Sequence, residues 1–192
     1  LYVYQIKSLS PLLMVVRVMT PLTINTTTED HFIAKLAAIA IVLSIIEFFL
    51  PSPIPGVKPG IANIIILYTL VKFNLQTAVW VSLIRVFVSS ILVGSLMAPT
   101  FFLSLFGAIS SLIFLFIFQK LPKKYFSVIS LGIIAAFGHI LGQFFIARIW
   151  IIPHDSIFNL LPLFLISSLI FGVLSGFITN TLLEHKTNRL PN

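Results

Sequence analysis

Cysteine is absent from this 192-residue chain, which excludes disulfide bonds, thiolate metal sites, iron–sulfur clusters and cysteine nucleophiles. Acidic residues are scarce as well, because Asp and Glu together number 5 against 12 Lys and Arg. The only aspartates, Asp30 and Asp155, cannot build the aspartate-rich site that binds Mg²⁺ and a diphosphate. A GxxxxGKS/T phosphate loop is also missing, so we do not expect the chain itself to hydrolyse nucleotides in the P-loop manner.

The remaining polar residues do not suggest an enzyme either. The histidines His31, His139, His154 and His185 lack the spacing of metal ligands. No Ser–His–Asp arrangement can be argued, because Asp155 falls in a predicted surface loop. We therefore expect a protein that is not an enzyme and that carries no metal and no cofactor.

Apolar residues dominate the chain. They make up 58% of it, with 19 Phe among them, while charged residues make up 9% and the mean hydropathy is +1.12. A soluble domain of this size cannot bury so much apolar surface in one core, whereas lipid can cover it. The formal charge of +7 does not indicate nucleic-acid binding, because the basic residues are few and lie beside apolar runs, as membrane topology requires.

The apolar runs predict an all-α integral membrane protein with about six transmembrane helices. The predicted spans are residues 33–50, 60–72, 76–97, 100–118, 126–152 and 160–183. The second span is short for a bilayer that takes roughly 20 helical residues, so we expect it to be tilted, partly re-entrant or shielded by its neighbours. The fifth is long, and we expect it to be tilted or bent around Gly132, Gly138 and Gly142.

These spans define the expected domain organisation. Residues 1–30 form an uneven leader without the order of a secretory signal, and we expect it to be poorly ordered or peripheral. Residues 31–186 form the six-helix membrane domain, and residues 187–192 form a cytoplasmic tail.

The positive charges predict the orientation of the chain in the membrane. With six spans, one side carries Lys35, Lys72, Lys120, Lys123, Lys124, Lys186 and Arg189. The other side has only Lys58 and Arg148 near its boundaries. Because basic residues accumulate on the cytoplasmic side, we expect a multi-pass protein of a bacterial cell membrane with both termini in the cytoplasm.

Ionisable side chains inside membrane spans are costly, so each is a candidate functional residue. Glu47 lies near the outer end of the first span. Arg85 lies about nine residues into the third span, near mid-bilayer at roughly 1.5 Å rise per residue. Other interpretations stay open: Glu47 is simply solvated at the interface, and Arg85 pairs with Glu47 or extends toward the surface.

A polar pair lies in the fifth span. His139 and Gln143 are one helical turn apart and therefore share a face of the helix. A lone histidine there serves helix packing more often than ligand binding, and the pairing leaves both roles open. Asn63 and Asn180 also need partners inside the membrane. Arg148 lies on the far side of its helix from His139, so we expect it to be an interfacial anchor.

The connection between the first two spans, PSPIPGVKPG, is unusually rich in proline. Prolines at 51, 53, 55 and 59 prevent regular helix and fix an extended loop. Such a loop suits a rigid rim over an outward-facing cavity, in which Lys58 would meet an anionic group. The alternative is a tight extracellular turn with an exposed lysine.

Small residues recur at helical spacing in two spans. Ala34 and Ala38 are four residues apart at the start of the first span, and Gly138 and Gly142 form a GxxxG in the fifth. This spacing lets helices approach closely.

The segment EFFLPSPIPGVKPGIAN, residues 47–63, resembles the signature of the family called heptaprenyl diphosphate synthase component I, also known as the Gx transporter family. The resemblance continues through Arg85, SLFGAISS at 104–111 and GHILGQ at 138–143, and it covers roughly residues 33–183. The family often has asparagine after this histidine, whereas this chain has Ile140.

The resemblance implies a fold and a function. The family is similar to the S components of energy-coupling factor (ECF) transporters, which are six-helix membrane proteins that capture a vitamin-like substrate from outside. S components dock on a transmembrane coupling subunit and a pair of ATPases through an AxxxA pattern on their first helix. Ala34 and Ala38 match that pattern in position.

We therefore expect an S-component-like bundle that binds a small molecule for uptake. The expected pocket residues are Glu47, Lys58, Asn63, Arg85, His139 and Gln143. Lys58 and Arg85 would meet anionic groups, and Glu47 a cationic or hydrogen-donating one. The expected partners are membrane lipid, the coupling subunit, the ATPase pair and the ligand, and not nucleic acid. Two alternatives remain: an accessory membrane subunit of a prenyl diphosphate synthase, and a subunit of flavin- or quinone-dependent membrane electron transfer.

Overall fold

The protein is seen here in a computed structural model that describes residues 26–50, 60–120, 127–151 and 153–187. The chain divides into two units, Leu1–His31 and Phe32–Asn192. Of the first unit only residues 26–31 are described, and there the Asp30 carboxylate accepts hydrogen bonds from the amide and hydroxyl of Thr27, both at 2.8 Å. The rest of the expected leader lies outside the described residues.

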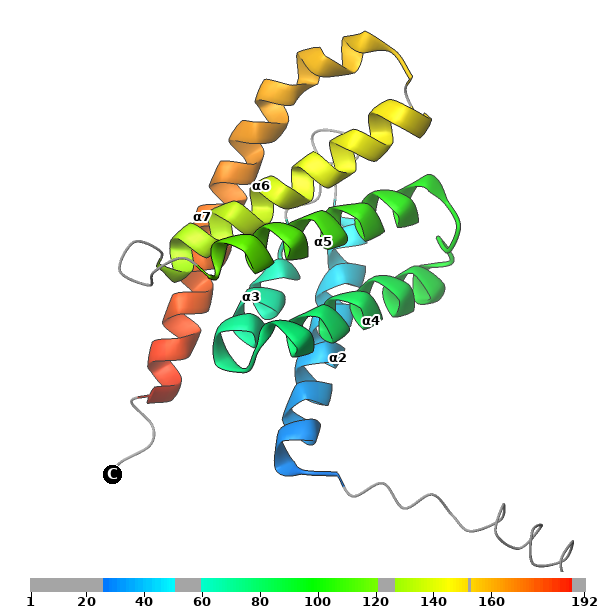
Figure 1. Ribbon diagram of the computed structural model, residues 1–192. Coiled ribbons are helices and arrows are strands. Elements are labelled where there is room, and N and C mark those ends of the chain that lie inside the picture. Colours follow the sequence, from blue (N-terminus) through cyan, green and yellow to red (C-terminus); the bar gives the residue numbers. More distant parts are fainter. Residues whose placement is uncertain (1–25, 51–59, 121–126, 152, 188–192) are drawn as a thin grey trace, which may run out of the picture. The chain divides into compact units, whose positions relative to one another are not determined.

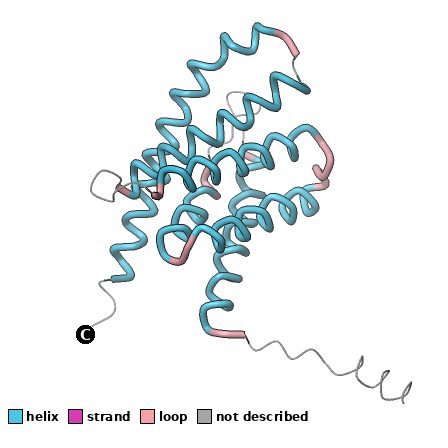
Figure 2. The backbone as a smooth tube through the Cα atoms, viewed as in Figure 1, coloured by secondary structure: helices cyan, strands magenta, loops and turns pink. Residues whose placement is uncertain are grey.

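All regular structure in the described residues is helical (Figures 1 and 2). The helices are α2 (Thr28–Phe49), α3 (Asn63–Lys72), α4 (Leu75–Val93), α5 (Pro99–Phe118), α6 (Val128–Ile146), the π-helical turn η1 (Ala147–Ile151), the 3₁₀ helix η2 (Asp155–Leu160) and α7 (Leu161–Thr187). In the described residues, 5 helical segments are long and apolar enough to cross a membrane, and α3 is the shorter sixth. The prediction of an all-α membrane bundle is confirmed.

The short helix α3 is enclosed by the other helices. Residues 64–70 are all buried, so protein surrounds this segment on every side. Thr179 of α7 donates its hydroxyl to the Ile64 carbonyl at 3.3 Å, which ties α3 to the last helix. Of the three possibilities for the short second span, shielding by neighbours is the one that the structure supports.

The helix boundaries follow local capping chemistry. The Asn74 side chain caps α4 by accepting from the Thr77 amide at 2.9 Å. Gly94 ends α4 in the left-handed region at φ 74°, which glycine adopts without steric cost. Ser127 caps α6 by accepting from the Ser130 amide at 3.2 Å. These caps place the helices within a few residues of the predicted spans.

Glycines allow α6 to pack closely against both α5 and α7. A Cβ added to Gly132 would lie 2.6 Å from the Gly172 carbonyl oxygen, and one added to Gly176 would lie 2.6 Å from the Ile129 Cα. Gly142 packs directly against the Phe106 backbone of α5. The departure of α6 from regular α-helix lies beyond its glycines, in η1. The GxxxG formed by Gly172 and Gly176 in α7 was not singled out from the sequence.

The start of α2 and the end of α3 meet at one end of the bundle. The rings of Phe32 and Phe73 are 5.9 Å apart, and the Lys72 ammonium lies 5.9 Å from the centre of the Phe32 ring. Lys35, one turn after Phe32, lies at this same end. The location of this end in the cytoplasm stays a prediction.

Candidate ligand-binding site

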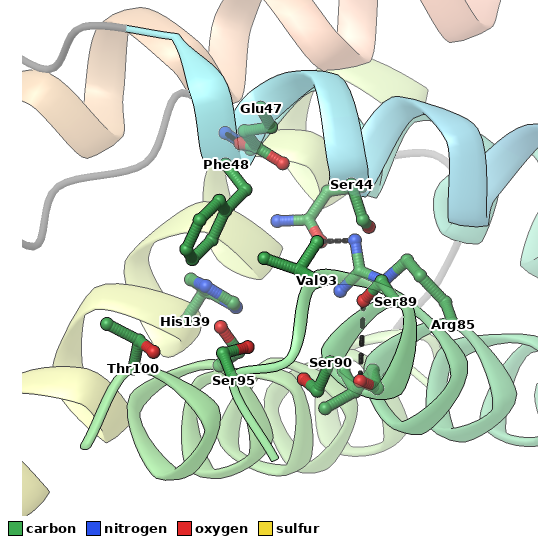
Figure 3. A pocket seen from close by; sticks show the side chains of 14 residues that line it. Ser44, Glu47, Phe48, Arg85, Ser89, Ser90, Val93, Ser95, Thr100 and His139 are labelled. Carbon is green, nitrogen blue, oxygen red and sulfur yellow. Dashed lines mark hydrogen bonds between the residues drawn. The ribbon is translucent and has the colours of Figure 1, made fainter. Parts of the chain in front are cut away.

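A polar cavity, lined by residues of α2, α3, α4, α5 and α6, lies at the other end, where α2 ends and α3 begins (Figure 3). Among its lining residues are Glu47, Asn63, Arg85 and His139. The structure therefore brings together four of the six expected pocket residues, which lie far apart in the sequence. The volume of the cavity is about 40 Å³, enough for a few waters or one small polar group. The role of these four residues in ligand binding remains a prediction.

The Glu47 side chain is hydrogen-bonded to the turn that leads into α3. Its side chain is only 6% exposed, so the alternative of a solvated Glu47 at the interface is wrong. Its Oε1 accepts hydrogen bonds from the Gly60 amide and from the Ile61 amide, the latter at 3.2 Å. Both amides belong to the turn that precedes α3, and the carboxylate gives these two backbone donors a charged acceptor. Gly60 presents its amide from a left-handed backbone conformation at φ 72°.

Arg85 is a buried cation with few partners. It is 5% exposed and its guanidinium points into the polar cavity toward α2, so it does not extend to the surface (Figure 3). Its Nη1 donates to the Asn63 Oδ1 at 3.3 Å. Its Nε is buried and has no hydrogen-bond partner among the described residues. Glu47 attracts it electrostatically, but no ion pair within 4.0 Å joins them in the described part of the chain.

The predicted pairing of His139 and Gln143 is present. Gln143 Nε2 lies 3.1 Å from His139 Nε2, and both side chains are buried. Gly107 of α5 makes room for them, because a Cβ there would lie 2.8 Å from His139 Cε1. His139 lines the polar cavity, whereas Gln143 lines a second, apolar cavity of about 310 Å³ between α5, α6 and α7. Gln143 therefore contributes to the site from the other side of His139.

Hydroxyl groups make up much of the remaining polar lining, and sequence reasoning missed them. They belong to Ser44, Ser89, Ser90, Ser95, Thr100 and Ser104. A signal was available, since Ser89 follows Arg85 by one helical turn, and Thr100 and Ser104 are also one turn apart. Hydroxyls near a buried cation suit an oxygen-rich anion, because they donate hydrogen bonds where the cation supplies charge.

The polar cavity does not account for every predicted residue. Lys58 and the proline-rich loop, residues 51–59, are outside the described residues. Ala34 and Ala38 are both exposed on α2, while Ala37 between them is buried. The face with the predicted docking residues is therefore not covered by the described part of the chain.

Arg148 and Asn180 each have a partner near the helix ends. Arg148 forms an ion pair with Asp155 at 2.6 Å, and the two side chains are 33% and 82% exposed. The pair joins η1 to η2, and the role of Arg148 as an interfacial anchor stays a prediction. Asn180 donates to Glu184 at 2.7 Å within α7. The described residues contain no group of three His, Asp or Glu close enough to hold a metal ion.

Comparison with known proteins gives one match. The family model described as "Heptaprenyl diphosphate synthase component I" matches residues 36–182, which include the whole polar cavity. The chain belongs to this family. No curated protein and no solved structure matches it.

Proposed function

We propose that this member of the heptaprenyl diphosphate synthase component I family is the membrane-embedded substrate-binding subunit of a small-molecule uptake transporter, energised by separate ATPase subunits. The observation that carries the proposal is the Arg85 guanidinium, which is buried in a polar cavity and has, among the described residues, one long hydrogen bond to a neutral partner. A buried charge is costly unless it is paired and fully hydrogen-bonded. An anionic ligand group would supply what the described residues do not.

The other lining residues support an anionic ligand. Ser90 and Thr100 line the cavity with hydroxyl groups, and His139 adds a ring nitrogen. The Glu47 carboxylate is held by the Gly60 and Ile61 amides, so Arg85 retains most of its capacity for a ligand anion. A carboxylate or phosphate bound by two guanidinium nitrogens would fit this arrangement.

The exposed face of α2 supports docking on a partner. Ala34 and Ala38 lie one turn apart and Val42, 54% exposed, continues the same line. Small side chains let another membrane helix approach closely. We propose that the coupling subunit docks here and that the partner ATPases, not this chain, hydrolyse nucleotide.

A second candidate follows from the family description, which names a component of a prenyl diphosphate synthase. In that case this chain is an accessory membrane subunit and the catalyst is another chain. We propose that this chain is not itself the synthase, because its aspartates have structural partners: Asp155 pairs with Arg148 and Asp30 with Thr27. A redox subunit would require a bound flavin or quinone.

Affinity purification tests the proposal. The chain is tagged at its C-terminus, extracted in mild detergent, and its co-purifying proteins are identified by mass spectrometry. We expect a transmembrane coupling subunit and an ATPase pair, and we expect Ala34→Leu with Ala38→Leu to lose them. Val173→Leu, at a 42% exposed position of α7, is the matched control and should keep them. Recovery of a soluble prenyl synthase instead, or flavin or quinone absorbance in the pure protein, would overturn the transporter proposal.

A further inference from the structure

The polar cavity is too small for a whole vitamin-sized ligand. At about 40 Å³ it accommodates an anionic group and little more. Sites that bind small organic molecules usually have volumes of about 300–1,000 Å³ and mostly apolar walls. If this chain binds a substrate at Arg85, most of that substrate must lie elsewhere.

The apolar cavity is next to the polar one and has the missing volume. It measures about 310 Å³ and lies between α5, α6, η2 and α7, with Leu103, Ile140, Phe144, Ile157 and Phe164 among its walls. Thr100 lines both cavities. The hydrogen-bonded pair of His139 and Gln143 has one member in each lining, so these three residues form the partition between the cavities. Figure 3 shows Thr100 and His139 on the same side of the polar cavity.

Gln143, which lines the apolar cavity, has one unsatisfied polar atom. Gln143 is 5% exposed, and its Oε1 is buried with no hydrogen-bond partner among the described residues. Leaving a buried acceptor unsatisfied costs about 1–3 kcal/mol. A ligand N–H or O–H donor placed in this cavity would satisfy it, which a hydrocarbon chain of a bilayer lipid cannot do.

We infer that the ligand is an amphiphile whose anionic group binds Arg85 and whose apolar body, carrying one hydrogen-bond donor, occupies the apolar cavity and donates to Gln143. The inference rests on the proposed anion-binding function and adds to it the substrate class. The partition of Thr100, His139 and Gln143 lies where the two parts of the ligand join. Specificity then comes from two separate contacts, the charge at Arg85 and the donor at Gln143.

Equilibrium dialysis of the full chain in detergent against empty micelles tests this, with indole-3-butyrate as the amphiphile and butyrate as its head alone. The indole ring supplies the apolar body and its N–H the donor. We expect indole-3-butyrate to bind about tenfold or more tightly than butyrate, because the apolar ring leaves water. Ala147 also lines the apolar cavity. Ala147→Phe fills this cavity and should remove the advantage of indole-3-butyrate, while butyrate binding stays unchanged. Leu103→Phe fills the same cavity from α5 and should do likewise.

Ile149→Phe is the matched control, because it adds a ring two residues further along, at a position 59% exposed. It should bind both compounds like the wild type. The inference is overturned if the wild type binds both compounds equally or binds neither. It is also overturned if both filled variants bind indole-3-butyrate as tightly as the wild type does. A third outcome also overturns it: Ala147→Phe loses co-purified phospholipid but still binds indole-3-butyrate as the wild type does. A bilayer lipid would then be the occupant of the apolar cavity. If instead Arg85→Gln leaves butyrate binding unchanged, the anion site of the proposed function fails.

Discussion

Arg85 of α4 and Asn63 of α3 are joined by a 3.3 Å hydrogen bond that links the cation in the polar cavity to the first residue of the shortest α-helix described. N–H···O hydrogen bonds are usually about 2.7–3.2 Å long, so the guanidinium is held loosely. The Asn63 helix start is in turn held by Glu47 through the Gly60 and Ile61 amides. Contacts therefore run from Arg85 of α4, through Asn63 of α3, to Glu47 of α2.

Arg85→Gln should abolish binding of anionic ligands without lowering stability. Removing a buried charge that has few partners is neutral or stabilising, whereas the ligand loses its main partner. Ligand binding and the melting temperature in detergent measure the two effects on the same preparation. Arg148→Gln is the control, because that arginine is exposed and paired with Asp155, and it should bind as the wild type does. Loss of folding in Arg85→Gln would show that the cation serves stability instead.

Glu47→Gln should destabilise the protein by about 1–3 kcal/mol, because two amides in the turn before α3 lose a charged acceptor. Thermal unfolding in detergent measures the change. Glu184→Gln removes a carboxylate that accepts from Asn180 on the exposed surface of α7, and it should change stability by about 0.5 kcal/mol or less. Equal stability of both variants would contradict a capping role for Glu47.

Gly107→Ala should displace His139, because the added Cβ would lie 2.8 Å from His139 Cε1 and 2.9 Å from its Nε2. We expect both lower stability and weaker ligand binding. His139→Ala in the same chain removes the clash, so the double variant should be more stable than the sum of the two single changes predicts. Simple additivity in this double-mutant cycle would place His139 away from Gly107.

Cysteine labelling can test the orientation, since the chain has no native cysteine. Asp155→Cys and Lys120→Cys place single thiols at exposed positions on opposite ends of the bundle. In intact cells a membrane-impermeant maleimide should label the first and not the second, because the lysine-rich end is predicted to be cytoplasmic. The opposite labelling pattern would reverse the topology.

The sequence predicted the helices well because the signals for them are local. Long apolar runs gave the approximate positions of the helices, whereas the caps at Asn74, Gly94 and Ser127 were not predicted. The polar residues inside the spans were also found, since a charge or an amide is rare in a membrane helix. Their convergence on one cavity required the packing of five helices, which no local pattern encodes.

The hydroxyl lining was missed for a physical reason. Serine and threonine in membrane helices commonly donate to their own backbone, as Ser175 does to the Gly172 carbonyl at 3.1 Å, so their presence says little about a site. The role of Glu47 was missed because its partners, the Gly60 and Ile61 amides, come from backbone beyond the proline-rich loop. Every residue except proline has a backbone N–H, so the residue types do not show which amides will bind a carboxylate.

The α2 helix carries Ala34 and Ala38 near its start and Glu47 near its end, about 20 Å away at 1.5 Å per residue. Any partner bound at the alanines and any ligand bound beside Glu47 therefore act on the same helix. Thermodynamic reciprocity then applies: if ligand binding strengthens partner association by some factor, partner association strengthens ligand binding by that same factor. Measured affinities for ligand with and without the partner should obey this equality, and a subunit that releases substrate on docking will show a factor below one.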